Sequence, residues 1–247
     1  MKLLPLGVGR IDMALWIVTE EEGTVDLPIT SWLIDHPDGL VLFDTGMHPG
    51  LQHDVERLGR STSFLTVDYH PGEEVSARLD GLGIRPADID RVVISHLHFD
   101  HAGGCGQLPE ARLVVNRAEW EAGQDQALID GGVYHPIDYE LGHEVEQVDD
   151  GHDVFGDGRL ICVATPGHTA GHQALRVELE SGPVVLTGDC IYFDRMLAEM
   201  RVPRFGFDAD LQRESMRRLA TMRDHGCRLL YGHDREQLDG LPDGGLA

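Results

Sequence analysis

One ten-residue segment limits the folds open to this chain more than any other feature of its sequence. Residues 95–104 read SHLHFDHAGG and place three imidazoles and a carboxylate within six positions, directly after the apolar run 92–94. Protonated imidazoles would repel one another here, and neutral buried ones would leave polar groups unsatisfied. A divalent cation would satisfy all of them. Because α/β proteins hold their sites where strands end, we expect an α/β fold with a metal site at the end of this strand.

Three more candidate ligands stand just after other apolar runs. His168 follows a Pro-Gly turn, Asp189 lies in the segment TGD, and His233 lies in YGHD. Taken singly, His168 could be a turn histidine and Asp189 a turn cap, but a carboxylate also suits a bridge between two cations. One zinc site uses about four ligands, so the sequence supplies enough for two metals. The candidate ligands are His96, His98, Asp100, His101, His168, Asp189 and His233.

Asp44 and the remaining histidines are expected to have other roles than metal binding. Asp44 ends the apolar run 40–43, which is a typical place for a carboxylate that orients a ligand imidazole; a turn cap is the equal alternative. His172 follows His168 by four residues and is expected to be structural, since one imidazole of this pair is enough. Isolated histidines are expected only to form hydrogen bonds. These are His36, His53, His70, His143 and His152.

Short apolar runs separated by turn residues predict the strands. Residues 32–35 and 40–43 flank the turn HPDG and predict a hairpin. Further strands are expected at residues 91–95, 112–115, 160–164, 174–179, 184–187 and 228–231.

Helices are expected between some of these strands. One covers residues 75–82, a second begins at Asn116 with Glu119 as its capping partner, and a third begins at the N-cap Asp208. Strands and helices do not alternate strictly, so a mixed-sheet α/β sandwich fits better than a doubly wound parallel sheet. Residues 1–247 contain no long linker, and we expect them to form one domain.

The charge balance and the cysteines argue against several classes of protein. Forty-three Asp and Glu against 20 Lys and Arg give a net charge of -23, which repels nucleic acid and anionic lipid. The first 18 residues are interrupted by Gly, Arg and Asp, which argues against a signal peptide or a membrane span. The four cysteines are widely spaced with no C-x-x-C pair. We therefore expect a cytoplasmic protein without disulfides, nucleic-acid partner or membrane partner.

With these motifs in place, the sequence resembles the metallo-β-lactamase-fold hydrolases, whose signature is His-x-His-x-Asp-His followed by a later His, Asp and His. Among them it is most similar to the N-acyl homoserine lactonases that degrade quorum-sensing signals. The similarity includes residues 165–173 (TPGHTAGHQ), 206–208 (GFD) and 232–237 (GHDREQ), and covers about residues 40–237. The resemblance implies an αββα sandwich, in which two mixed β-sheets are flanked by helices.

The resemblance also implies the cofactor and the reaction. It implies two zinc ions per chain, with iron, cobalt or manganese as other divalent candidates. The implied reaction opens the lactone ring of N-acyl homoserine lactones by attack of a metal-bridging hydroxide. The implied ligands are His96, His98 and His168 for one metal and Asp100, His101 and His233 for the other, with Asp189 as the bridge.

Roles at the substrate follow from the same resemblance. Tyr192 would hydrogen-bond the substrate carbonyl, although a core tyrosine is the alternative, and Asp100 would carry a proton to the leaving oxygen. Phe99 and Gly206 match positions that line the lactone pocket. The expected partner is a small-molecule lactone, and a homodimer is possible. Met13, Trp16, Phe64 and Leu65 could form an acyl-chain groove or pack in the core.

Other activities on the same fold stay open at this point. A second lactonase, such as a 4-pyridoxolactonase, is the closest alternative because its motifs are shared. A glyoxalase-II-type thioesterase would use the same ligands, but no basic patch for glutathione is evident. A β-lactamase more typically has Cys where Asp189 stands. A mononuclear iron persulfide dioxygenase and a metal-binding protein without activity are more remote alternatives.

Overall fold

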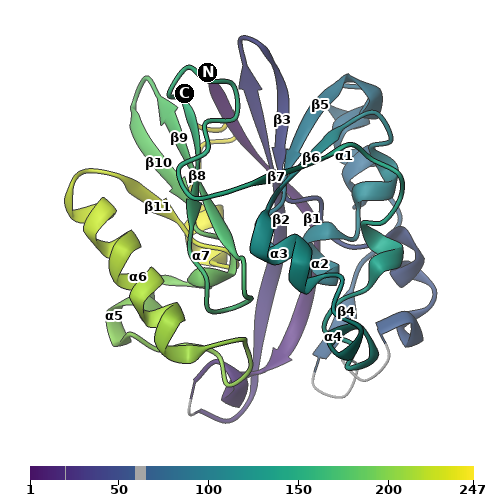
Figure 1. Ribbon diagram of the computed structural model, residues 1–247, viewed down its shortest axis with the longest axis vertical. Coiled ribbons are helices and arrows are strands. Elements are labelled where there is room, and N and C mark those ends of the chain that lie inside the picture. Colours follow the sequence, from purple (N-terminus) through teal and green to yellow (C-terminus); the bar gives the residue numbers. More distant parts are fainter. Residues whose placement is uncertain (20, 59–64) are drawn as a thin grey trace.

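The computed structural model describes residues 1–19, 21–58 and 65–247. Within these residues two β-sheets pack face to face, and helices lie on their outer sides (Figure 1). The seven-stranded sheet has the order β4-β1-β2-β3-β5-β6-β7 and the four-stranded sheet the order β11-β10-β9-β8. The strands of the first sheet are β1 (Lys2–Ala14), β2 (Thr24–His36), β3 (Gly39–Phe43), β4 (Leu65–Asp68), β5 (Ile89–Val93), β6 (Arg112–Asn116) and β7 (Val145–Val148). Those of the second are β8 (Leu160–Ala164), β9 (Gln173–Leu179), β10 (Gly182–Leu186) and β11 (Arg228–Leu230).

Both sheets are mixed, as expected from the sequence. In the larger sheet β4, β1, β2 and β3 pair antiparallel, whereas β3, β5, β6 and β7 pair parallel. In the smaller sheet β10 pairs antiparallel with β9 and parallel with β11. The predicted αββα sandwich is therefore confirmed, and β2 and β3 form the predicted hairpin.

The helices flank the sandwich. Figure 1 shows α6 on the outer side of the four-stranded sheet and α1 on the outer side of the larger one. Asp208 caps α6 by accepting from the backbone N–H groups of Asp210 and Leu211, as predicted. The helices are α1 (Val75–Gly81), α2 (Phe99–Ala102), α3 (Arg117–Ala122), α4 (Gln126–Asp130), α5 (Asp194–Glu199), α6 (Ala209–Asp224) and α7 (Arg235–Asp239).

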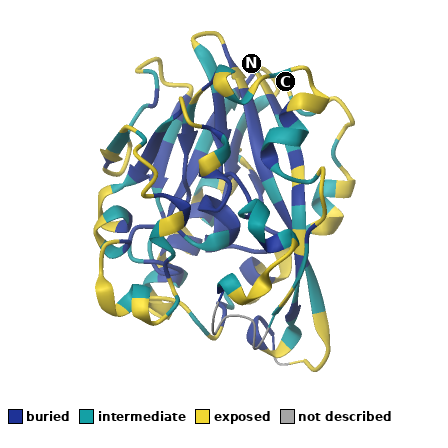
Figure 2. Ribbon diagram, turned by 90° about the vertical axis from the view of Figure 1, so that its right-hand side faces the viewer, coloured by how far each residue is buried: buried dark blue, intermediate teal, exposed yellow. Residues whose placement is uncertain are grey.

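Burial on both faces explains why the central strands are nearly continuous apolar runs. In β3, Val41 and Phe43 belong to the core between the sheets, whereas Leu42 packs with the core that extends under the helices. Figure 2 shows buried strands in the centre and exposed residues along the rims. Such strands lose the polar and apolar alternation of a half-exposed sheet.

The longest strands are those that the sequence predicts least well. β2 begins at Thr24, eight residues before the predicted hairpin strand, and β1 was not predicted at all. β1 carries a bulge between Gly7 and Arg10, and Gly9 there has φ of 103°. The bulge interrupts the apolar alternation and disguises the strand. No helix among the described residues is long and apolar enough to cross a membrane.

Candidate metal centre

The candidate ligands come together because strand ends meet at one edge of the sandwich. β8, β10 and β11 run in the same direction, so His168, Asp189 and His233, which follow them, lie at the same edge of the smaller sheet. His96 follows β5 of the larger sheet. The backbone N–H of Gln173 donates to the Ser95 carbonyl at 2.9 Å, which joins the two sheets at this point.

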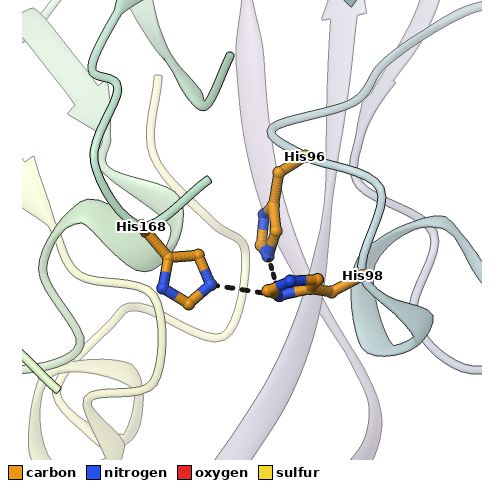
Figure 3. Close-up of side chains that lie close together, drawn as sticks. All are labelled: His96, His98 and His168. Atoms are coloured by element: carbon orange, nitrogen blue, oxygen red, sulfur yellow. Dashed lines mark hydrogen bonds between the residues drawn. The ribbon is translucent and has the colours of Figure 1, made fainter. Parts of the chain in front are cut away.

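Three imidazoles form a first ligand group. His98 Nδ1 lies 2.9 Å from His96 Nε2 and 3.1 Å from His168 Nε2 (Figure 3). A single ring nitrogen offers one hydrogen or one lone pair, so it cannot form two full hydrogen bonds at these distances. Burial lowers the pKa of His98 to about 4, and lowers the pKa values of His96 and His168 well below the usual range. Three neutral imidazoles with converging nitrogens suit a bound cation.

Asp189 lies between this first group and a second one. Its Oδ2 is 3.4 Å from His168 Nε2 and 4.0 Å from His96 Nε2. Its Oδ1 is 2.9 Å from His233 Nε2 and 3.1 Å from His101 Nε2. Each carboxylate oxygen therefore faces a different set of imidazoles, which is the arrangement a bridging ligand requires.

The second group is Asp100, His101 and His233, whose ligand atoms lie within 4.8 Å of one another. Within the described part of the chain, His101 Nε2 and Asp189 Oδ1 are buried and lie 3.1 Å apart, but neither forms a hydrogen bond of good geometry. Burial opposes protonation of His101, but the carboxylates of Asp189, Asp100 and Asp44 outweigh it and raise the His101 pKa well above its usual value. Three carboxylates around one imidazole favour positive charge at this place, so the residues fit a second cation.

Hydrogen-bond partners on the side away from the cluster orient the candidate ligand imidazoles. Asp44 Oδ2 lies 2.8 Å from His101 Nδ1 and accepts from the Ser95 hydroxyl at 2.8 Å, while its Oδ1 accepts from the Ser95 backbone N–H at 2.7 Å. Asp44 therefore lies directly behind the imidazole of His101, which is one of the candidate ligands. His233 Nδ1 lies 3.0 Å from the Pro28 carbonyl oxygen, and Ser95 Oγ lies 2.9 Å from His96 Nδ1. These contacts leave the opposite ring nitrogens free to face the cluster.

Two residues that hold Asp189 complete the surroundings of the ligands. His172 Nε2 accepts from the Asp189 backbone N–H at 3.0 Å, and its Nδ1 lies 2.8 Å from the Thr165 hydroxyl. It lies behind Asp189, in keeping with the structural role expected. The buried Gln212 donates from Nε2 to the carbonyls of Asp189 and Cys190. Gln212 was not predicted, because nothing in a helix sequence distinguishes an inward-facing glutamine that holds a loop.

An apolar cavity of about 250 Å³ opens onto the ligands. Tyr192 and Phe99 line it, as do His98, Asp100, Asp189 and His233. The Tyr192 ring is buried and stands 4.9 Å from the His233 ring, centroid to centroid. The remaining apolar wall consists of Ile11, Met13, Leu27, Leu65, Val133 and Phe205.

Several pocket residues depart from the expectations. Phe205, which was not predicted, lines the cavity, whereas the neighbouring Gly206 lies against the backbone of residues 167 and 168 with φ of 143°. Met13 and Leu65 line the cavity, but Trp16 is not in its wall and is half exposed. Phe64 lies outside the described residues.

Isolated histidines outside the cluster form hydrogen bonds or polar contacts. His36 is buried, lies 3.1 Å from Asp157 Oδ2 and stacks on Phe155. His143 Nε2 lies 3.1 Å from the Leu108 carbonyl oxygen. The prediction that these two only form hydrogen bonds agrees with their surroundings.

Glu119 is the clearest error of the helix prediction. Asn116 caps α3, since its side chain accepts from the Ala118 backbone N–H, but Glu119 does not complete a capping box. Its carboxylate instead accepts from the backbone N–H groups of Leu97 and Gly171. The cap prediction for Glu119 was wrong because a long-range contact replaced the local one.

Replacement of Gly171 by alanine should destabilise the fold by about 2 kcal/mol or more. A Cβ at Gly171 would lie 2.0 Å from the Glu119 backbone nitrogen, so α3 and this loop would have to separate. Gly81→Ala is the control, because Gly81 ends α1 with no atom within 4 Å of an added Cβ. Urea unfolding should show a large loss for Gly171→Ala and at most about 1 kcal/mol of change for Gly81→Ala. Equal stability of both variants would refute the close approach.

Comparison with known protein families agrees with the fold and the site. The family described as the metallo-beta-lactamase superfamily matches residues 24–225. A solved N-acyl homoserine lactone hydrolase, with the product N-hexanoyl-L-homoserine bound at its catalytic metal centre, superposes with a TM-score of 0.87. The two share 27% sequence identity, and the superposition covers 98% of this chain and 96% of that one.

Characterised relatives are closer in sequence. The N-acyl homoserine lactonase AttM of Azorhizobium caulinodans is 34% identical over 217 residues, which are 85% of this chain and 82% of that protein. An N-acyl homoserine lactonase of a Bacillus species is 33% identical over 223 residues, covering 86% of this chain and 84% of that protein. The chain therefore belongs to the metallo-beta-lactamase superfamily and, within it, to the family that contains the N-acyl homoserine lactonases.

Proposed function

We propose that this protein hydrolyses the lactone ring of N-acyl homoserine lactones and releases the N-acyl homoserine. The observation that carries the proposal is the apolar cavity whose wall contains Tyr192 and four of the seven clustered candidate ligands, His98, Asp100, Asp189 and His233. A polar lactone ring suits the end of this cavity next to the candidate metal ligands, and an acyl chain suits its apolar wall. The names of the lactonase relatives support the same substrate class.

We further propose that two zinc ions bind per chain. His96, His98 and His168 would hold one ion, Asp100, His101 and His233 the other, and Asp189 would contact both. When bound, zinc lowers the pKa of water toward neutrality and polarises a carbonyl. Because ligands come from loops of both sheets, we propose that residues 1–247 act as one catalytic domain.

Two side chains are proposed to act on the substrate itself. Hydrolysis adds a hydroxyl group to the carbonyl carbon of the lactone and breaks the bond between this carbon and the ring oxygen. The ring oxygen then requires a proton. The Tyr192 phenol would donate to the carbonyl oxygen as negative charge develops there. The pKa of this phenol is raised well above its usual value, chiefly by burial, so the phenol keeps its hydrogen. Asp100, in the cavity wall, would deliver the proton to the leaving ring oxygen.

A substrate panel tests the proposal. The zinc-loaded protein should open N-hexanoyl- and N-decanoyl-homoserine lactones with a higher kcat/KM than γ-butyrolactone, pyridoxolactone, a glutathione thioester or a β-lactam. Mass spectrometry of the products should show the addition of one water. A clear preference for the thioester or for pyridoxolactone would refute the substrate assignment.

The Tyr192→Phe variant should keep both metals and the fold while kcat/KM on N-acyl homoserine lactones falls about 10 to 1,000-fold. The loss of one donor to a developing oxyanion accounts for about 1.5 to 4 kcal/mol. Elemental analysis and kinetics on the same preparation check both halves of this expectation. Tyr139→Phe is a matched control, because this buried phenol donates to the Gly123 carbonyl instead. Wild-type kinetics in Tyr192→Phe would leave the phenol with a packing role only.

A further inference from the structure

Glu119 is a fully buried carboxylate that the proposed chemistry does not use. Its Oε1 accepts from the Leu97 backbone N–H at 2.9 Å and the Tyr134 hydroxyl at 3.0 Å. Its Oε2 accepts from the Thr169 hydroxyl at 2.6 Å and the Gly171 backbone N–H at 3.0 Å. Burying a carboxylate costs solvation free energy, so four donors gathered around one such group require an explanation.

Three of the four donors, Leu97, Thr169 and Gly171, belong to the two segments that carry the first ligand group. Leu97 stands between His96 and His98, and Thr169 directly follows His168. The third segment is α3 itself, whose backbone approaches Gly171 so closely that no side chain would fit there. The Glu119 carboxylate is therefore hydrogen-bonded to residues next to all three imidazoles in the chain. These imidazoles follow strands of two different sheets.

We propose that Glu119 is a positioning residue for the first metal. It holds residues 96–98 and 168–171 at the separation at which the nitrogens of His96, His98 and His168 meet around one cation. This role rests on the proposed metal site. It concerns the geometry of that site, and it is independent of which lactone is the substrate.

The chemistry of the four partners explains why a carboxylate is needed. All four are donors in this arrangement, and an ionised carboxylate only accepts. Glutamine has the same shape, but its amide nitrogen would face one backbone N–H, which cannot accept, so that hydrogen bond is lost and the hydroxyl beside it must reverse its role and accept. The segments of His96 and His168 would then separate by relaxation, and the three nitrogens would no longer converge.

The test uses Glu119→Gln together with a matched control. Asp138→Asn removes the charge of another buried carboxylate, which is paired with Arg57 at 2.9 Å outside the ligand cluster. Cobalt(II) binding is measured by competition with a chelator, and the visible absorption of bound cobalt reports its ligand geometry. In Glu119→Gln the cobalt affinity of the site formed by the three imidazoles should fall about 10 to 100-fold, whichever of the two sites binds more tightly. The absorption spectrum of cobalt at that site should also change. Asp138→Asn should match the wild type in both.

The outcomes separate this role from general stability and from the proposed activity. Unchanged cobalt affinity and spectrum in Glu119→Gln, or changes no larger than in Asp138→Asn, would overturn the positioning role. If Glu119→Gln fails to fold, Tyr134→Phe and Thr169→Val each remove one donor, and wild-type cobalt binding in both would overturn it equally. Wild-type protein that binds two cobalt ions but opens no lactone would refute the proposed activity and not the role of Glu119. Wild-type protein that binds no cobalt would refute both.

Discussion

Asp189→Asn should reduce kcat/KM for lactone hydrolysis by about 1,000-fold or more, which corresponds to about 4 kcal/mol. The substitution keeps the shape of the side chain and replaces one carboxylate oxygen by an amide nitrogen without a free lone pair. Since Oδ1 faces His101 and His233 while Oδ2 faces His168, one of the two groups must lose a ligand atom. Elemental analysis should show fewer than two metals per chain.

The control for this variant is Asp125→Asn. Asp125 caps α4 by accepting from the Ala127 backbone N–H, and asparagine caps a helix equally well. This variant should retain wild-type kinetics and metal content. Full metal content and activity in Asp189→Asn would show that Asp189 is only a turn residue.

Removal of the metals should lower the free energy of unfolding substantially. Without cations, the carboxylates of Asp44, Asp100 and Asp189 lie close together around His101, and their mutual repulsion opposes folding. A ligand that binds only the folded state stabilises it by about 4 kcal/mol at 1,000 times its dissociation constant. Urea unfolding of chelator-treated protein, with and without added zinc, measures this difference. Identical unfolding midpoints would contradict a metal site built into the fold.

The clustering of the candidate ligands could be predicted from sequence because each lies in a short motif at the end of an apolar strand. Asp44 was identified for the same reason, and the structure places it against His101. Because these strands end at the same edge of the sandwich, the motifs that follow them lie close together, and no knowledge of long-range contacts is needed to expect this. The partition into two groups needed the family resemblance, because spacing along the chain does not say which loops face each other.

The pocket wall and the supports of the ligands could not be predicted in the same way. Ile11 and Leu27 belong to β1 and β2, whose regular alternation is interrupted at the bulge of β1. Glu119 satisfies a local capping pattern in the sequence, yet its partners are 15 to 52 residues away along the chain. Gln212 is a polar residue on a helix whose role depends on a loop 22 and 23 residues away. Long-range contacts of this kind leave no short sequence pattern.

The most direct test of a two-metal lactonase is to titrate metal-free protein with zinc while following lactone opening and bound zinc together. N-hexanoyl-homoserine lactone is the substrate, and the protons released on ring opening report the rate. Ligand atoms arranged in two groups around Asp189 predict that activity reaches its maximum at two zinc ions per chain. Full activity at one zinc ion per chain, or in the chelator-treated protein, would contradict it.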